Sequence, residues 1–222
     1  MSDTSADARS DVSRQWIMAH VLGGIVLATV PIASDLVIKW TGIKAGHVGM
    51  LDLLVLGIVL IAANSLSLLI LGYLSGVVLR QKLPLFPLRT WLMLYALFGL
   101  FVGLLSAMTW LDEESELNKM GLDDFTVLAV GIVAGGILGM LVGATVGGLE
   151  ALVLRKTAEG LRTWVLYSAL ASLPIAFVTV LMVVYGPLSG FVSEVLGAVA
   201  GFVATIVGAF VMLPALHRLR PR

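Results

Sequence analysis

Residues 77–97 read VVLRQKLPLFPLRTWLMLYAL, and residues 152–170 read LVLRKTAEGLRTWVLYSAL. With a gap of two residues in the shorter segment, VVLR aligns with LVLR, and LRTW aligns with LRTW. Two matches in the same order, at the same boundary between an apolar run and a basic loop, indicate an internal repeat. A related phrase, Arg14-Gln15-Trp16, begins the first apolar run. We therefore expect three repeated units, at about residues 14–80, 89–155 and 162–218.

The composition places this repeat in a membrane. Apolar residues make up 59% of the 222 residues and charged residues only 13%, whereas soluble domains contain roughly 45–50% apolar and about 25% charged residues. Six apolar runs are each long enough to cross about 30 Å of hydrocarbon as a helix. They are Trp16–Ile38, Met50–Leu79, Trp91–Leu111, Phe125–Leu154, Trp164–Tyr185 and Leu188–Leu216.

The sequence thus predicts an all-α integral membrane protein with six transmembrane helices. The repeat predicts that they form three helical hairpins in parallel orientation, related by an approximate threefold axis. Residues 16–216 form one transmembrane domain in this interpretation, in which the first helix is retained rather than cleaved as a signal peptide. Residues 1–15 are a polar leading segment, and residues 217–222 are a basic tail.

The basic residues predict the orientation. Eleven of the fourteen lie at one set of helix ends, and only Lys39, Lys44 and Lys119 lie at the other. By the positive-inside rule, the richer side is the cytoplasm, so both termini are expected there and the chain is expected in the cell membrane. The eleven are Arg9, Arg14, Arg80, Lys82, Arg89, Arg155, Lys156, Arg162, Arg218, Arg220 and Arg222.

Each odd-numbered helix begins with an Arg-x-Trp phrase. Arginine extends toward headgroups, and tryptophan prefers the membrane–water interface, so we expect these pairs to act as interfacial anchors. A specific phospholipid headgroup site is the alternative. The pairs are Arg14 with Trp16, Arg89 with Trp91, and Arg162 with Trp164.

Small residues recur at every fourth position in the even-numbered helices. Such a stripe lets helix backbones approach closely in lipid, so we expect the even-numbered helices to make the central contacts, with the tryptophan-led helices outside. Lining of a narrow pore is the alternative. The glycines of the stripe are Gly131, Gly135, Gly139, Gly143 and Gly147 in the fourth helix, and Gly197 and Gly201 in the sixth.

Polar side chains within the spans are few and are candidate functional groups. His20, Tyr95 and Ser168 occupy matching positions in the three units, so they are expected either as a polar ring or as unrelated residues near one face. Asn64 is expected to contact another helix or a solute.

Glu150 lies five residues before Arg155, which places it roughly a turn and a half inside the end of its span. Its matching positions are Ser75 and Leu213. A salt bridge at the membrane boundary, with Arg155, with Lys156 or with a neighbouring hairpin, is the favoured interpretation of this carboxylate. A proton site is the alternative.

No serine nucleophile motif, zinc motif, phosphate loop or dinucleotide fingerprint is found, and there is no cysteine. We therefore expect no enzyme activity, no catalytic or metal-binding residues, no cofactor and no nucleic-acid partner. The expected partners are membrane lipids, further copies of the chain or other membrane subunits. Two functions remain. One is a small channel or a solute-transport or substrate-binding subunit for a weakly polar solute, and the other is a non-transporting structural or assembly subunit.

Overall fold

The computed structural model describes residues 3–41, 50–109, 124–185 and 191–222, and nearly all of these are helical. Two short strands form an antiparallel pair near the C-terminus. The helices are α1 (Asp3–Thr41), α2 (Met50–Lys82), α3 (Leu88–Thr109), α5 (Asp124–Leu154), α6 (Leu161–Ala171), α7 (Leu173–Tyr185) and α8 (Phe191–Arg218), and the strands are β1 (Ala158–Glu159) and β2 (Arg220–Pro221).

Several helices have the length and apolar composition of membrane spans, which is compatible with a multi-pass membrane protein. Five such stretches lie within the described residues, and they correspond to the second to sixth predicted spans. The first predicted span, in α1, is not among them and stays a prediction. The five are Gly57–Lys82, Leu88–Leu105, Ala129–Leu154, Leu161–Val180 and Val195–Arg218.

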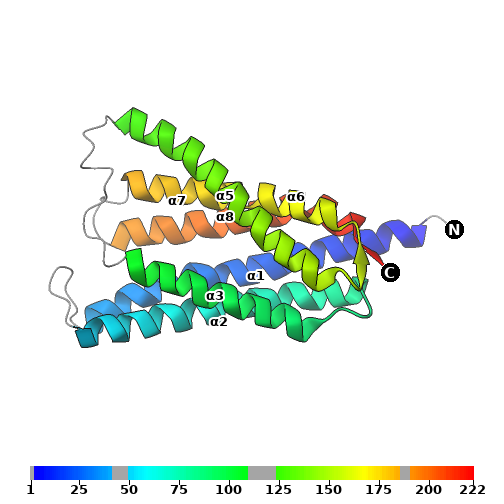
Figure 1. Ribbon diagram of the computed structural model, residues 1–222, viewed down its shortest axis with the longest axis horizontal. Helices are drawn as coiled ribbons and strands as arrows, with labels where there is room; N and C mark the ends of the chain where they lie inside the picture. The colour runs from blue at the N-terminus through cyan, green and yellow to red at the C-terminus, as the bar shows by residue number, and fades with distance from the viewer. Residues whose placement is uncertain (1–2, 42–49, 110–123, 186–190) are drawn as a thin grey trace.

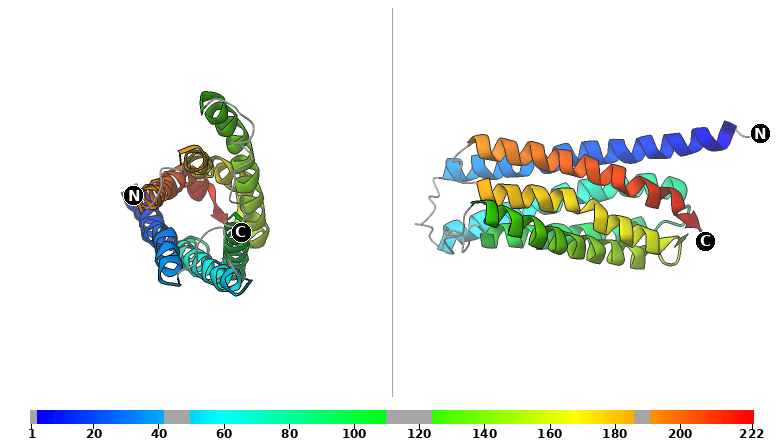
Figure 2. Two further views of the ribbon diagram at one scale, coloured as in Figure 1. Left: turned by 90° about the vertical axis from the view of Figure 1, so that its left-hand side faces the viewer. Right: turned by 90° about the horizontal axis from the view of Figure 1, so that it is seen from above.

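The helices run side by side, with both chain termini at one end of the bundle (Figure 1). We call this the termini end and the opposite one the loop end. Viewed along the bundle, the helices follow one another around a ring (Figure 2), and α8 packs against α1 to close it. Helix α3 packs extensively on α2 but only slightly on α5, which lies mainly on α6 and α7.

The fifth predicted span is divided into two helices. The predicted single helix Trp164–Tyr185 breaks at Ser172, between α6 and α7. Pro174 explains the break, because proline has no N–H and its ring clashes with the carbonyl four residues earlier. The Ser172 Oγ atom lies 2.7 Å from the Gly139 carbonyl oxygen of α5 and 2.7 Å from the Ala169 carbonyl oxygen of α6, so the two acceptors share its one proton and the break lies against α5.

The glycine stripe of α5 packs against α6 and α7. A side-chain carbon added at Gly143 would lie 2.5 Å from the Ser168 carbonyl oxygen, and carbons added at Gly135 and Gly139 would also meet residues of α7. The second, fourth and sixth predicted spans, now α2, α5 and α8, were expected to contact one another at the centre, but the stripe of α5 does not make such contacts. In the ring, each of these three helices lies between helices of the odd-numbered spans. On α8, Gly197 is half-buried, and a carbon at Gly201 would meet nothing within 4 Å.

The packing of α5 predicts that alanine at two of its glycines changes the free energy of unfolding by different amounts. Gly143→Ala places a methyl group against the Ser168 carbonyl and the Ser172 side chain, so we expect it to lower the free energy of unfolding by about 1–3 kcal/mol. Gly148→Ala meets nothing within 4 Å, so it is expected to be neutral or to stabilise by up to about 1 kcal/mol through helix propensity. Thermal unfolding in detergent measures both, and equal destabilisation would contradict the close packing.

Candidate functional site, a buried tryptophan hub

The most deeply buried side chains gather at the termini end. The three tryptophans of the Arg-x-Trp phrases lie at their centre, with exposures of 2% for Trp16, 0% for Trp91 and 1% for Trp164. We define the tryptophan hub as these three residues together with Tyr95 and Glu150. The fully buried leucines around it are Leu79, Leu83, Leu154, Leu216 and Leu219.

The three indole rings come from three different helices and meet inside the ring. Trp16 and Trp164 have ring centroids 5.9 Å apart, and Trp91 and Trp164 have centroids 6.5 Å apart. Both pairs are edge-on, at 76° and 66°, which is a favourable geometry for aromatic pairs. The indoles thus join α1, α3 and α6 across the bundle.

Each indole N–H donates to a neighbouring helix. Trp16 donates to the Ala209 carbonyl of α8 at 3.2 Å, and Trp91 donates to the Gly72 carbonyl of α2 at 3.0 Å. Trp164 instead donates to a side chain, the Glu150 Oε2 atom of α5, at 2.9 Å. In all three cases the acceptor lies on the helix that precedes the tryptophan's helix around the ring: α8 precedes α1, α2 precedes α3, and α5 precedes α6.

This placement corrects one expectation from the sequence. The indoles of Trp16, Trp91 and Trp164 were expected at the lipid interface as anchors, but they lie inside the protein. The physical reason is that each indole finds both apolar neighbours and a hydrogen-bond acceptor on an adjacent helix. The accompanying arginines, at positions 14, 89 and 162, are exposed, and their role as anchors stays a prediction.

The Glu150 carboxylate ties three helices together. Its Oε1 atom accepts a hydrogen bond from the Tyr95 hydroxyl of α3 at 2.9 Å, and its Oε2 atom accepts the Trp164 bond from α6. Its side chain is 5% exposed. Within the described part of the chain it is held by these two neutral donors rather than by Arg155 or Lys156, both of which are exposed. The Tyr95 bond is thus a direct link across the sparse α3–α5 contact.

The expected polar ring is not joined by hydrogen bonds. His20 stacks on Trp16 and donates from Nδ1 to the Trp16 carbonyl at 2.9 Å. The Ser168 hydroxyl lies 3.7 Å from the Met212 sulfur, and Tyr95 reaches Glu150. Among the described residues, no hydrogen bond connects any two of His20, Tyr95 and Ser168. The Asn64 amide donates to the Leu60 carbonyl of its own helix at 2.8 Å.

The buried leucines of the hub were not singled out from the sequence. Leu79 and Leu154 are 0% exposed, as is Leu216 on α8. A signal for two of them exists, because the repeated VLR phrase places a leucine directly before Arg80 and Arg155. We interpreted that phrase only as a membrane boundary, whereas the leucine in it points into the core.

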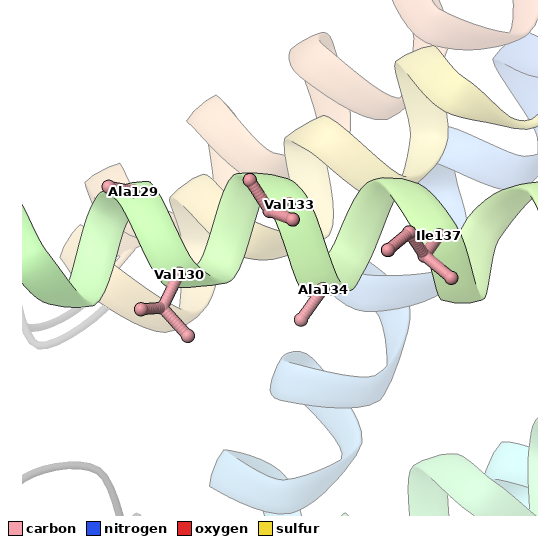
Figure 3. Close-up of a pocket in the computed structure, with 5 residues that line it drawn as sticks. All are labelled: Ala129, Val130, Val133, Ala134 and Ile137. Atoms are coloured by element: carbon pink, nitrogen blue, oxygen red, sulfur yellow. The ribbon is translucent and has the colours of Figure 1, made fainter.

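A shallow apolar depression lies elsewhere, on the half of α5 nearest the loop end. It is lined by residues from three successive turns of this one helix (Figure 3). Because the lining carries only methyl-bearing side chains, it offers apolar contact and no polar group to orient a ligand. The residues are Ala129, Val130, Val133, Ala134 and Ile137.

Comparison of the chain with protein-family models, with curated proteins and with solved structures found no match.

The hydrogen bonds of the hub predict that substitutions of Glu150 lower the free energy of unfolding to different extents. Glu150→Leu leaves the Tyr95 hydroxyl and the Trp164 N–H without an acceptor, and each loss is expected to cost about 1–3 kcal/mol of unfolding free energy. Glu150→Gln is expected to be milder, because its amide oxygen can accept from Trp164 while its N–H donates to the Tyr95 oxygen.

Thermal unfolding in detergent tests the series, with the exposed Glu159→Gln as the control. Unfolding of Glu150→Leu at or above the wild-type temperature would show that burial of the carboxylate outweighs its hydrogen bonds.

Proposed function

We propose that the chain is built from three repeated helix pairs around an approximate threefold axis. The tryptophan hub supports a specific alignment of the three units with one another. Gly72, the acceptor for Trp91, lies seven residues before Leu79, and Ala209, the acceptor for Trp16, lies seven residues before Leu216. This spacing makes Leu79 and Leu216 equivalent positions, and the repeated VLR phrase aligns Leu154 with Leu79.

The same alignment changes one assignment made from the sequence. The residues four positions before the three leucines are Ser75, Glu150 and Met212, and all three are buried. The third unit is therefore aligned one residue earlier than alignment on Arg218 suggested, and Met212 replaces Leu213 as the counterpart of Glu150. Two units use a backbone carbonyl as the indole acceptor, and the second unit uses a carboxylate.

We propose that the protein is a non-transporting structural or assembly subunit of a membrane complex. The observation that carries this proposal is the meeting of the three indoles inside the ring at the termini end. A solute path through this end would have to separate Trp16, Trp91 and Trp164 and break their hydrogen bonds to three neighbouring helices. Such an interlocked centre suits a fixed scaffold.

The outward faces supply the surface for partners. Helix α5 leaves the bundle toward the loop end (Figures 1 and 2), and side chains such as Val133 and Leu138 are more than half exposed on it. Apolar helix faces of this kind contact lipid chains, a second copy or the helices of another subunit. These are the partners that we propose.

A small channel or a transport subunit for a weakly polar solute is the second candidate. The arrangement of the helices in a closed ring favours it, because such rings surround a common axis (Figure 2). In this case the tryptophan hub is the closed end of the path in the state described, and transport requires its rearrangement.

Flux and assembly measurements separate the two functions. If the protein is a scaffold, vesicles containing wild-type protein should take up glycerol no faster than protein-free vesicles, and Trp91→Ala should not change this. Purification in mild detergent should then give a particle larger than the 23.5 kDa chain, with a stoichiometric partner or further copies. Glycerol flux above the protein-free rate that responds to Trp91→Ala would contradict the scaffold and support transport.

The proposed orientation has its own test. The chain has no cysteine, and Leu85, in the connection between α2 and α3, is 77% exposed. In intact cells, Leu85→Cys should resist a membrane-impermeant maleimide and should react after permeabilisation. The control is His47→Cys, in a segment outside the described residues that the sequence places on the exterior, and it should react without permeabilisation. Labelling of Leu85→Cys in intact cells would reverse the orientation.

A further inference from the structure

The last residues of the chain pair with the loop between α5 and α6. Strand β2 runs antiparallel to β1, with Ala158 opposite Pro221 and Glu159 opposite Arg220. Arg222 extends the pairing, because its backbone N–H donates to the Thr157 carbonyl at 3.2 Å and its Nη1 donates to the Arg155 carbonyl at 2.8 Å. We call residues 155–162 and 218–222 together the basic clasp.

Apolar side chains and one glycine hold the basic clasp in place. Ala158 is 0% exposed and Leu219 is 1% exposed, and both belong to the core around the tryptophan hub. Gly160 has a φ of 84°, and a side-chain carbon there would lie 2.6 Å from the Arg218 carbonyl oxygen, so this position requires glycine. The pairing thus rests on the backbone and on buried apolar groups, and the charged side chains remain outside.

The pairing concentrates positive charge that is dispersed along the sequence. Six exposed basic side chains and one exposed carboxylate, Glu159, lie in the basic clasp. Within the described part of the chain, none of the six forms an ion pair with a carboxylate. The six are Arg155, Lys156, Arg162, Arg218, Arg220 and Arg222.

The basic clasp lies where three apolar helices end. The candidate spans end at Leu154 and Arg218 and begin at Leu161, so the clasp follows directly on them. Just inside this boundary, Leu152 is 57% exposed and Leu166 is 58% exposed. Charged groups next to the hydrocarbon lie at the depth of lipid phosphates, and apolar side chains one turn deeper lie at the depth of acyl chains.

We propose that the basic clasp binds the headgroups of anionic phospholipids in the adjacent leaflet. Guanidinium groups form charge-assisted, bidentate hydrogen bonds with phosphate oxygens, and each basic residue at an anionic membrane surface strengthens attachment about fivefold. The lipid is favoured over a free phosphate ion because the surface beside the clasp, at Leu152 and Leu166, also accommodates its chains.

Binding of short-chain lipids to the full-length protein in detergent tests the proposal. Dihexanoyl phosphatidylglycerol is the anionic probe, and dihexanoyl phosphatidylcholine and inorganic phosphate are the comparisons. The double variant Lys156→Gln/Arg162→Gln removes two clasp charges whose side chains form no hydrogen bond to any described residue, and it should weaken phosphatidylglycerol binding about 30-fold. The matched control, Arg80→Gln/Arg89→Gln, removes two exposed charges at the same end of the bundle but outside the clasp, and it should change binding less than twofold.

Three results would overturn the proposal. They are equal weakening by the control variant, equal affinity for phosphatidylcholine, and equal affinity for inorganic phosphate. The first would mean a general attraction to the basic end of the bundle, and the third would mean a soluble anion site. Thermal unfolding without lipid checks that each variant folds. A further variant, Arg220→Gln, should weaken phosphatidylglycerol binding about fivefold. Lys156→Arg keeps the charge and adds a guanidinium group, so it should bind phosphatidylglycerol at least as tightly as the wild type does.

Discussion

An indole N–H that is buried away from water must find a hydrogen-bond acceptor. Three such indole groups lie at the centre of the bundle. Lipid supplies no acceptor to replace a missing one, so each tryptophan requires a neighbouring helix at a fixed height. Trp16, Trp91 and Trp164 meet this requirement on α8, α2 and α5. Their hydrogen bonds join three pairs of neighbouring helices, and leucines fill the space around the rings.

Helix α5 meets the requirement differently from α2 and α8, and this affects the sparse contact between α3 and α5. Glu150 has two oxygens, so it can satisfy Trp164 and still accept the hydroxyl of Tyr95. A backbone carbonyl already engaged in its own helix serves a second helix less readily. The carboxylate therefore connects α3 to α5 at the termini end, where the two helices otherwise pack little. Toward the loop end, α5 departs from the bundle (Figure 1).

The second to sixth spans could be predicted from the sequence because their signal is local, and the break at Pro174 also has a local cause. The position of the tryptophans could not be decided in this way. An Arg-x-Trp phrase at a helix end suits both an interfacial anchor and a buried core residue, and the outcome depends on acceptors far away in the chain, such as Ala209 for Trp16. The basic clasp likewise depends on two segments about 60 residues apart, which hydropathy alone does not bring together.

The bond between Trp16 and Ala209 has a consequence for biosynthesis. It joins the first helix to the last, and chains emerge from the ribosome N-terminus first. During translation, the Trp16 N–H therefore lacks the Ala209 carbonyl as an acceptor while the helices between α1 and α8 are made. The centre of the bundle therefore cannot be completed until α8 has been made, although α1, α3 and α6 supply its three indole rings earlier.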